Sequence, residues 1–537
     1  MTELELRENI AKSIWKIADG LRNMVDGWDF KEYVLGFMFY KYISERLKSD
    51  INENERQSDS NFDYADLSDE DVLDEMKESL KQEKGYFILP SDLFENVLKE
   101  AEKSSHADGI QERLKRAFDN ISESARGCKS FEYFSSLFSV IQLNSSEKLG
   151  KTLEIKNKRI LEILKGINKI KQELCGEGVY IDSFGAAYEY LIGMYAQSAG
   201  KSGGEFFTPS EVSELLAKLA LDNRTKIEKV YDPACGSGSL LLKFLSAVKE
   251  KGGSLSKIYG QEINDTTHKL AFMNMFLRNV NYNDFDIAFG DTLLSPLSKE
   301  HCEIDAIVSN PPYSSVWKGH EVAEIKSDPR YSPAGALAPK NRSDLAFVMH
   351  SCYCLKNQGG VAAIVLFPGV FYRKGAEEKI RKYLIESNYV DSIIALPDNL
   401  FFGTNIATCI LVLKKGRPNT DIFFIDASKE FEKAKTKNRL AKENIQKILD
   451  TYYSRKVIPF FSRSVSYEEI KEQDYNLAIN RYVFAEEKEE EIDIDELNRE
   501  MELAEREIER LKVELQKVIR EIEAELKREE EGIAHGG

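Results

Sequence analysis

Short apolar runs that end directly in polar or glycine-rich motifs are the feature that most constrains the fold of this chain. They occupy residues 227–231, 258–260, 287–289, 306–308, 361–367, 392–396 and 408–413. The first five are mostly continuous apolar runs, which are typical of strands buried on both faces of a parallel sheet. Because helical stretches separate these runs, we predict a doubly wound α/β domain over residues 176–428, with its ligands at the carboxyl ends of the strands.

The first run ends in a glycine-rich turn, DPACGSG at residues 232–238, and a helical stretch follows. Glycine is needed where the backbone bends sharply and where a ligand approaches without a Cβ in the way. The spacing differs from the G-x-G-x-x-G of dinucleotide-binding proteins. The turn therefore suits a nucleoside that carries a charged amino acid, with Asp232 beside its ammonium group; a generic tight turn is the alternative. The predicted cofactor site takes Asp232, Ala234, Gly236, Ser237 and Gly238 from this turn.

The next two runs each end in an acidic residue. Glu262 follows the second run and is placed to accept hydrogen bonds from two ribose hydroxyls. Asp291 follows the third run and is placed to bind the amino group of an adenine ring. Taken alone, each is weak evidence, since glutamate is common at strand ends and aspartate often caps a turn.

The fourth run leads straight into the tetrapeptide Asn310, Pro311, Pro312 and Tyr313, which we predict to be catalytic. An amine on an aromatic ring is a poor nucleophile because its lone pair is delocalised. The Asn310 side-chain oxygen and the Pro311 carbonyl are two acceptors for its hydrogens, and the prolines fix the direction of that carbonyl. Tyr313 offers a flat face on which the target base can stack. The alternative is a turn that merely contains two prolines.

In this order the motifs resemble those of the γ group of amino-methyltransferases acting on DNA. That resemblance implies S-adenosylmethionine as cofactor and an adenine flipped out of double-stranded DNA as acceptor. It also covers the upstream segment GGEFFTP at residues 203–209. The residues it implies against the methionine part of the cofactor are Glu205, Phe206, Phe207, Thr208, Pro209 and Ser210.

Nearly the whole chain resembles the modification subunit of type I restriction–modification systems. The segments that carry this resemblance are residues 18–47, SDLAFVMH at 343–350, 396–415 and DYNLAINRYV at 474–483. The resemblance implies N6-adenine methylation by an assembly of two such subunits with one specificity subunit, and a restriction or translocase subunit as a further partner. The polar stretch at 53–71 and the acidic tail depart from the family pattern.

Helical patterning flanks the α/β domain on both sides. Residues 1–175 show apolar residues at helical spacing and are expected to form a helical N-terminal domain. Residues 429–485 are expected to form a mixed helical connector, with helix over 429–456. Residues 486–537 are expected to form an acidic coiled-coil helix for subunit docking, although such a helix can also fold back on its own domain. Its heptad seam consists of Leu497, Met501, Ala504, Ile508, Leu511, Leu515, Val518 and Ile522.

The charge of the chain does not favour tight DNA binding by the chain alone. The net charge is −17, of which −11 belongs to residues 486–531 and −6 to the rest. Phosphate binding depends on lysine and arginine, and no dense basic stripe occurs here. We therefore expect a partner to supply sequence recognition and much of the affinity for DNA.

The sequence contains no apolar run long enough for a membrane span and no secretory signal at its start, so we expect a cytoplasmic protein. Its seven cysteines lack a zinc spacing, and we expect no metal site. Three alternatives to the main hypothesis stay open: a solitary adenine methyltransferase, a protein glutamine methyltransferase and a non-catalytic scaffold. Chain length and the family-like flanks weigh against the second, and the intact motifs weigh against the third.

Overall fold

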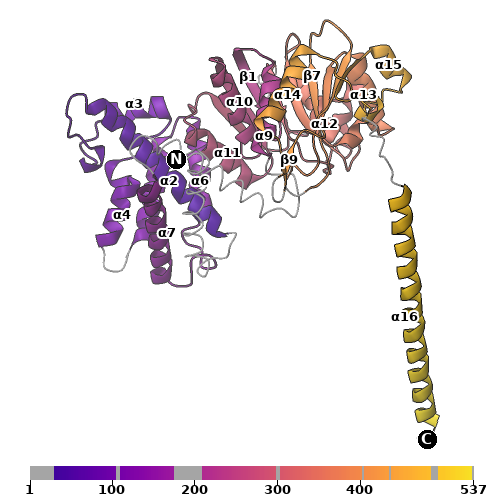
Figure 1. Ribbon diagram of the computed structural model, residues 1–537. Helices are drawn as coiled ribbons and strands as arrows, with labels where there is room; N and C mark the ends of the chain where they lie inside the picture. Colours follow the sequence, from indigo (N-terminus) through magenta and orange to yellow (C-terminus); the bar gives the residue numbers. More distant parts are fainter. Residues whose placement is uncertain are drawn as a thin grey trace. The chain divides into compact units, whose positions relative to one another are not determined.

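The computed structural model describes residues 29–103, 109–174, 208–297, 303–401, 404–433, 437–484 and 494–534. The chain divides into two compact units, Met1–Phe484 and Ala485–Gly537. The first unit contains a helical region and an α/β region, and the second contains one long helix (Figure 1).

A nine-stranded mixed sheet forms the centre of the α/β region, in the order β11-β8-β6-β7-β5-β4-β1-β2-β3. The strands from β5 to β3 in this order run parallel to one another, as do β6 and β8. β7 is antiparallel to both of its neighbours, and β11 is antiparallel to β8. The bounds are β1 Lys226–Asp232, β2 Ser254–Glu262, β3 Phe285–Phe289, β4 Ala306–Ser309, β5 Val361–Leu366, β6 Val390–Ala395, β7 Cys409–Lys414, β8 Ile422–Asp426 and β11 Ser462–Val465.

Alternate side chains of each central strand enter two different hydrophobic cores, one on each face of the sheet. In β4, Val308 belongs to the first core and Ile307 to the second, and both are fully buried. Burial on both faces explains why these strands are continuous apolar runs in the sequence. The predicted doubly wound α/β fold is therefore confirmed.

Helices cover both faces of the sheet (Figure 1). The buried residues of four helices join the first core: α9 Ser210–Leu221, α10 Ser239–Glu250, α11 Asp265–Leu277 and α14 Lys442–Ser454. Three described helices contribute to the second core: α12 Asp344–Cys354, α13 Ala376–Glu386 and the short α15 Tyr467–Glu472. Each helix thus buries one apolar face against the sheet.

The helical N-terminal region shares the first core with the sheet. Its described helices are α2 Asp29–Glu55, α3 Asp74–Lys84, α4 Phe94–Lys103, α5 Ile110–Ser124, α6 Ser130–Val140 and α7 Leu153–Leu174. Tyr133 of α6 stacks on Phe272 of α11 with the ring centroids 4.1 Å apart. The Tyr42 hydroxyl donates to the carbonyl of Leu277, 3.0 Å away. Residues 1–28 of the predicted helical domain lie outside the described residues.

Residues 429–484 differ from the predicted helical connector. A small hairpin, β9 Glu432–Lys433 and β10 Asn438–Arg439, precedes α14, so the prediction of helix throughout 429–456 is wrong for the hairpin. Further along, β11 pairs with β8 and extends the central sheet. Its sequence, SRSV, carries little apolar signal, because an edge strand gains its stability from backbone pairing with its single neighbour.

The second unit contains α16 Ile494–Ala534, a helix of 41 residues. Six of the predicted seam residues are about half exposed on it, between 48% and 60%. They are Met501, Ile508, Leu511, Leu515, Val518 and Ile522. Among the described residues, no helix has both the length and the apolar character required to cross a membrane.

Candidate active site

The predicted motifs gather where the sheet topology reverses. β1 lies between β2 and β4, so the chain winds outward from this point in both directions. In open α/β sheets, the crevice beyond the carboxyl ends of two such strands is where ligands bind. The glycine-rich turn follows β1, and Asn310 follows β4 directly.

Two glycines of the turn adopt backbone conformations that favour glycine. Gly238, with φ of 75°, precedes α10, and a Cβ there would lie 2.9 Å from the Cε of Met275. Gly236 has φ of 55°, and the space around its missing Cβ is open. Gly238 therefore serves helix packing, whereas Gly236 leaves room for a ligand to approach the backbone.

Asp232, the last residue of β1, is a buried carboxylate, only 2% exposed. Its Oδ1 accepts hydrogen bonds from the Ala234 amide at 3.0 Å and from the Ser309 hydroxyl at 2.9 Å. Burial raises the pKa of Asp232 to about 7, and the nearby charge of Glu262 adds to the effect. The sequence analysis missed Ser309. It is recognisable as a polar residue just before Asn310, at the end of a strand, whose side chain is fully buried.

The two predicted acids on neighbouring strands are held by backbone amides. Glu262 accepts from the amides of Gly236 at 3.0 Å and Asn264 at 2.8 Å, which brings it beside the glycine-rich turn. Asp291 accepts from the Leu293 amide at 2.9 Å through Oδ1 and so caps a turn. The Glu262 carboxylate therefore lies beside the same turn as Asp232.

The remaining predicted cofactor residues are distributed around this turn. Ala234 is half-buried and packs against the second core. Ser237 is buried, and its hydroxyl lies 3.0 Å from the hydroxyl of Ser239. Pro209 precedes α9, and Ser210 is its first residue. Three further predicted residues, Glu205, Phe206 and Phe207, lie outside the described residues.

Asn310 is oriented by two hydrogen bonds. Its Nδ2 donates to the Thr208 hydroxyl at 3.0 Å, and its Oδ1 accepts from the Tyr313 hydroxyl. Burial raises the pKa of Tyr313, so this hydroxyl remains a neutral donor. The acceptor that we assigned to a substrate amine is thus occupied by the fourth residue of the same motif, and Thr208, which we assigned to the cofactor, contacts Asn310.

The aromatic face of Tyr313 is backed by a second ring. Phe367, just after β5, lies with its centroid 4.3 Å from that of Tyr313 at an interplanar angle of 31°. Pro311 is buried and Pro312 is half-buried. Directly after the motif, the Ser314 amide donates to Asp344, the first residue of α12, at 3.1 Å. The tetrapeptide is therefore fixed at both ends.

The segment between Tyr313 and Ser343 is anchored by buried side chains. Trp317 and Arg330 are 3% and 5% exposed. Arg330 donates to the carbonyls of Thr292 and Leu293, each at 2.9 Å, and pairs with Asp328 at 2.7 Å. The segment is thereby tied to the turn that carries Asp291. Sequence reasoning missed Arg330, because nothing local distinguishes it from a surface arginine.

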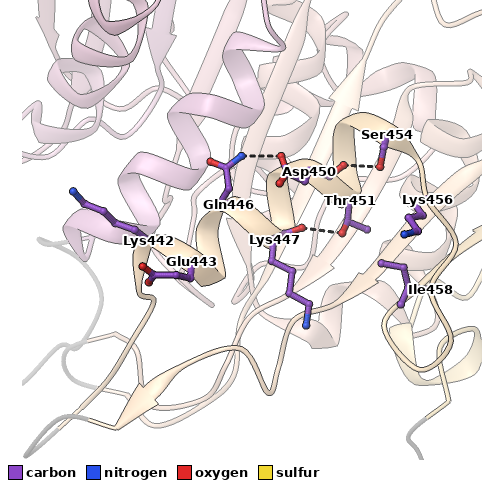
Figure 2. A pocket seen from close by; sticks show the side chains of 9 residues that line it. All are labelled: Lys442, Glu443, Gln446, Lys447, Asp450, Thr451, Ser454, Lys456 and Ile458. Carbon is purple, nitrogen blue, oxygen red and sulfur yellow. Dashed lines mark hydrogen bonds between the residues drawn. The ribbon is translucent and has the colours of Figure 1, made fainter.

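Elsewhere, α14 lines a surface groove of about 710 Å³ (Figure 2). Its polar side chains mostly bond within the helix, as Gln446 does to Asp450 at 2.7 Å. Lys442 and Lys447 alternate there with Glu443 and Asp450, so the groove has no dominant charge. In the described part of the chain, no group of three or more His, Cys, Asp or Glu residues could hold a metal ion.

The switch-point turn, the acids beside it and the Asn-Pro-Pro-Tyr motif define a class, the α/β methyltransferases. Within this class the chain belongs to the N-6 DNA methylase family, whose model matches residues 179–491, and residues 10–167 match the HsdM N-terminal domain. It is thus a methylase subunit of the type I restriction–modification kind.

Individual relatives agree with this assignment. The type I restriction enzyme MpnII methylase subunit of Mycoplasma pneumoniae is 46% identical, over 92% of each chain. The MjaVII methylase subunit of Methanocaldococcus jannaschii is 30% identical, over 91% of this chain and 80% of its own. The crystal structure of a type I methyltransferase subunit from Streptococcus thermophilus matches with a TM-score of 0.79 and 36% identity, covering 90% of this chain and 100% of that one.

Proposed function

We propose that this chain transfers a methyl group from S-adenosylmethionine to N6 of an adenine flipped out of double-stranded DNA. The observation that carries the proposal is the single hydrogen bond between Ser309 and Asp232. It joins the strand that leads into Asn310 to the buried carboxylate of the glycine-rich turn, so a cofactor and a target base held by these two motifs would be neighbours.

The residues in the crevice fit the cofactor. Asp232 is a buried acid whose pKa is raised to about 7 by burial, and an ammonium group beside it would stabilise its charged form. Glu262 would hold the ribose and Asp291 the adenine ring, whereas residues 205–210 would lie along the methionine part. The cofactor supplies an activated methyl group on a sulfonium, which needs no general base before transfer.

Asn310 and Pro311 orient the acceptor amine. In the structure, the Oδ1 of Asn310 accepts from the Tyr313 hydroxyl, and the amine of the target adenine would take that place. The Pro311 carbonyl would accept the second hydrogen of the amine. Tyr313 would then stack on the base while Phe367 supports its other face. Orientation of this kind supplies much of the rate acceleration.

Partners follow from the same proposal. A specificity subunit would read the DNA sequence, with two copies of this chain for each copy of it, and a restriction or translocase subunit can join that assembly. The half-exposed apolar seam of α16 supports docking on helices of the specificity subunit. Recovery of the intact complex after deletion of residues 490–537 would refute that docking. Such an enzyme works where the DNA is, in the cytoplasm.

Methyl transfer from labelled S-adenosylmethionine to DNA tests the proposal. The chain is assayed alone and with the product of a neighbouring gene that resembles a specificity subunit, and Asn310→Ala serves as the inactive control. We expect N6-methyladenine only with the partner and only with Asn310. Activity by the chain alone would indicate a solitary methyltransferase, and label on a protein instead of DNA would overturn the substrate.

A further inference from the structure

Two arginines lie on the two segments that border Tyr313. Arg342 immediately precedes Ser343, whose amide donates to the carbonyl of Ser315 at 3.1 Å, just beyond the catalytic motif. Arg373 follows β5 by seven residues, in the segment whose Phe367 stacks on Tyr313. Both guanidinium charges act on Asp344, which holds the Ser314 amide. The two arginines therefore lie on the two segments that contact the end of the motif, one at Ser315 and the other at Tyr313.

One buried carboxylate holds both arginines. Glu377, in the first turn of α13, has a side chain only 2% exposed. Its Oε2 is 3.1 Å from the Nη1 of Arg342, and its Oε1 is 3.4 Å from the Nη1 of Arg373. The Arg373 guanidinium packs against the backbone at Gly369, in the space that a Cβ would take. The arrangement is built into the fold.

The cluster presents positive charge outward. The side chains of Arg342 and Arg373 are each 33% exposed, whereas Glu377 is buried beneath them. A guanidinium has five N–H donors in a planar fork, and one carboxylate oxygen faces each arginine here. Two arginines and one glutamate leave a net charge of +1, which a single phosphodiester neutralises. Exposed Lys374 adds one positive charge, while buried Asp344 and half-buried Glu378 offset the formal balance, so the positive charge is confined to the exposed ends of the basic side chains.

We propose that Arg342 and Arg373, held by Glu377, bind a backbone phosphate beside the flipped adenine. The proposal rests on the proposed function, because a flipped nucleotide leaves its phosphates in the strand, at the rim of the pocket that takes its base. Guanidinium forks match phosphate geometry and bind it without reading sequence. The site gives this acidic chain a local hold on DNA where chemistry occurs, and leaves sequence recognition to a partner.

The test measures kcat/KM for plasmid DNA with the methylating assembly between about 50 and 200 mM KCl, the range over which phosphate binding dominates the salt dependence. We expect Arg342→Gln and Arg373→Gln each to lower kcat/KM about tenfold, the size of one charge-assisted hydrogen bond. Each should also flatten the plot of log kcat/KM against log salt by about 0.9 for each phosphate charge that the protein no longer neutralises. The KM for S-adenosylmethionine should not change.

Two comparison variants distinguish phosphate binding from a purely structural role of the ion pairs with Glu377. Glu377→Gln keeps both arginines and should keep the full salt slope, although it lowers thermal stability. Lys382→Gln, on the same helix and paired with Glu386, should change neither quantity. If a glutamine variant does not fold, Arg342→Lys replaces it and should keep the slope while losing affinity.

Unchanged slopes in both arginine variants would overturn the site, as would a slope in Glu377→Gln as flat as theirs. The wild-type assembly controls for the underlying function. If it methylates no DNA at any salt concentration, the proposed function fails and the phosphate site fails with it. If it methylates DNA normally while the arginine variants behave like wild type, only the phosphate site fails.

Discussion

Binding of S-adenosylmethionine should weaken sharply below pH 7, because Asp232 must be ionised to pair with the ammonium group. Burial raises the pKa of Asp232 to about 7 in the free protein. The dissociation constant then scales as one plus the protonated-to-ionised ratio, which predicts an increase of about 25-fold from pH 7.5 to pH 5.5. The ligand's own ammonium group stays mostly charged across this interval, so the protein carboxylate dominates the change.

Replacement of Asp232 by asparagine should have opposite effects on binding and on stability. Asp232→Asn loses the charged partner, so affinity at pH 7.5 should fall roughly 10- to 100-fold and should no longer depend on pH. In the native state the Asp232 carboxyl group stays protonated up to about pH 7, whereas in the unfolded state it ionises near its ordinary pKa of 3.8. Stability of the free protein is therefore lost as pH rises through this interval, by up to about 4 kcal/mol at pH 8.

Isothermal titration calorimetry at several pH values checks the binding result, and thermal unfolding at pH 5 and pH 8 checks the stability result. Asp232→Asn should be more stable than wild type by about 4 kcal/mol at pH 8 and by only about 2 kcal/mol at pH 5, because the unfolded Asp232 is already mostly ionised at pH 5. Asp305→Asn is the matched control, because Asp305 is also buried but caps the opposite end of β4 through the amides of Glu228 and Lys229. Wild-type affinity that stays constant from pH 7.5 to pH 5.5 would refute the pairing with the ammonium group.

Three further substitutions test how the site is held. Thr208→Val removes the acceptor for Asn310 Nδ2 and should lower kcat at saturating cofactor by up to about tenfold; an unchanged kcat would show that Thr208 does not orient Asn310. Tyr313→Phe keeps the stacking face and should retain kcat/KM within about tenfold, whereas Tyr313→Ala should lose roughly 5- to 150-fold in steady-state assays; equal losses would contradict stacking. Arg330→Gln leaves Asp328 without its cation and should cost about 1–3 kcal/mol in urea unfolding, with a raised KM for the cofactor; unchanged stability would show that Arg330 does not anchor the turn.

The sequence predicts those parts of the site that consist of residues adjacent to a recognisable strand. Asp232, Glu262 and Asn310 follow apolar runs, and the rule that parallel strands end at one edge of the sheet brings them together. Arg330 and Glu377 have, besides a local partner each, a second partner 35 or more positions away, which neither composition nor periodicity reveals. Their signal is burial, which only the folded chain provides.

Strand prediction failed at the edge of the sheet for a different reason. β11 is the edge strand beside β8, and it has only four residues, two of which are serine. A central strand must be apolar because both of its faces are buried, so it appears in the sequence as a continuous apolar run. An edge strand must mainly complete backbone hydrogen bonds, which any residue except proline can do.

The hydrogen bond from Tyr313 to Asn310 bears on how a base enters the pocket. If the target amine replaces the tyrosine hydroxyl, one bond to Oδ1 is exchanged for another, so the net gain at this atom is small. Discrimination for an amine then depends on its second hydrogen, which the Pro311 carbonyl would accept. A base that donates only one hydrogen would replace the Tyr313 hydroxyl without adding a hydrogen bond. An exocyclic amine donates two hydrogens and adds the bond to the Pro311 carbonyl, so the tetrapeptide favours an amine.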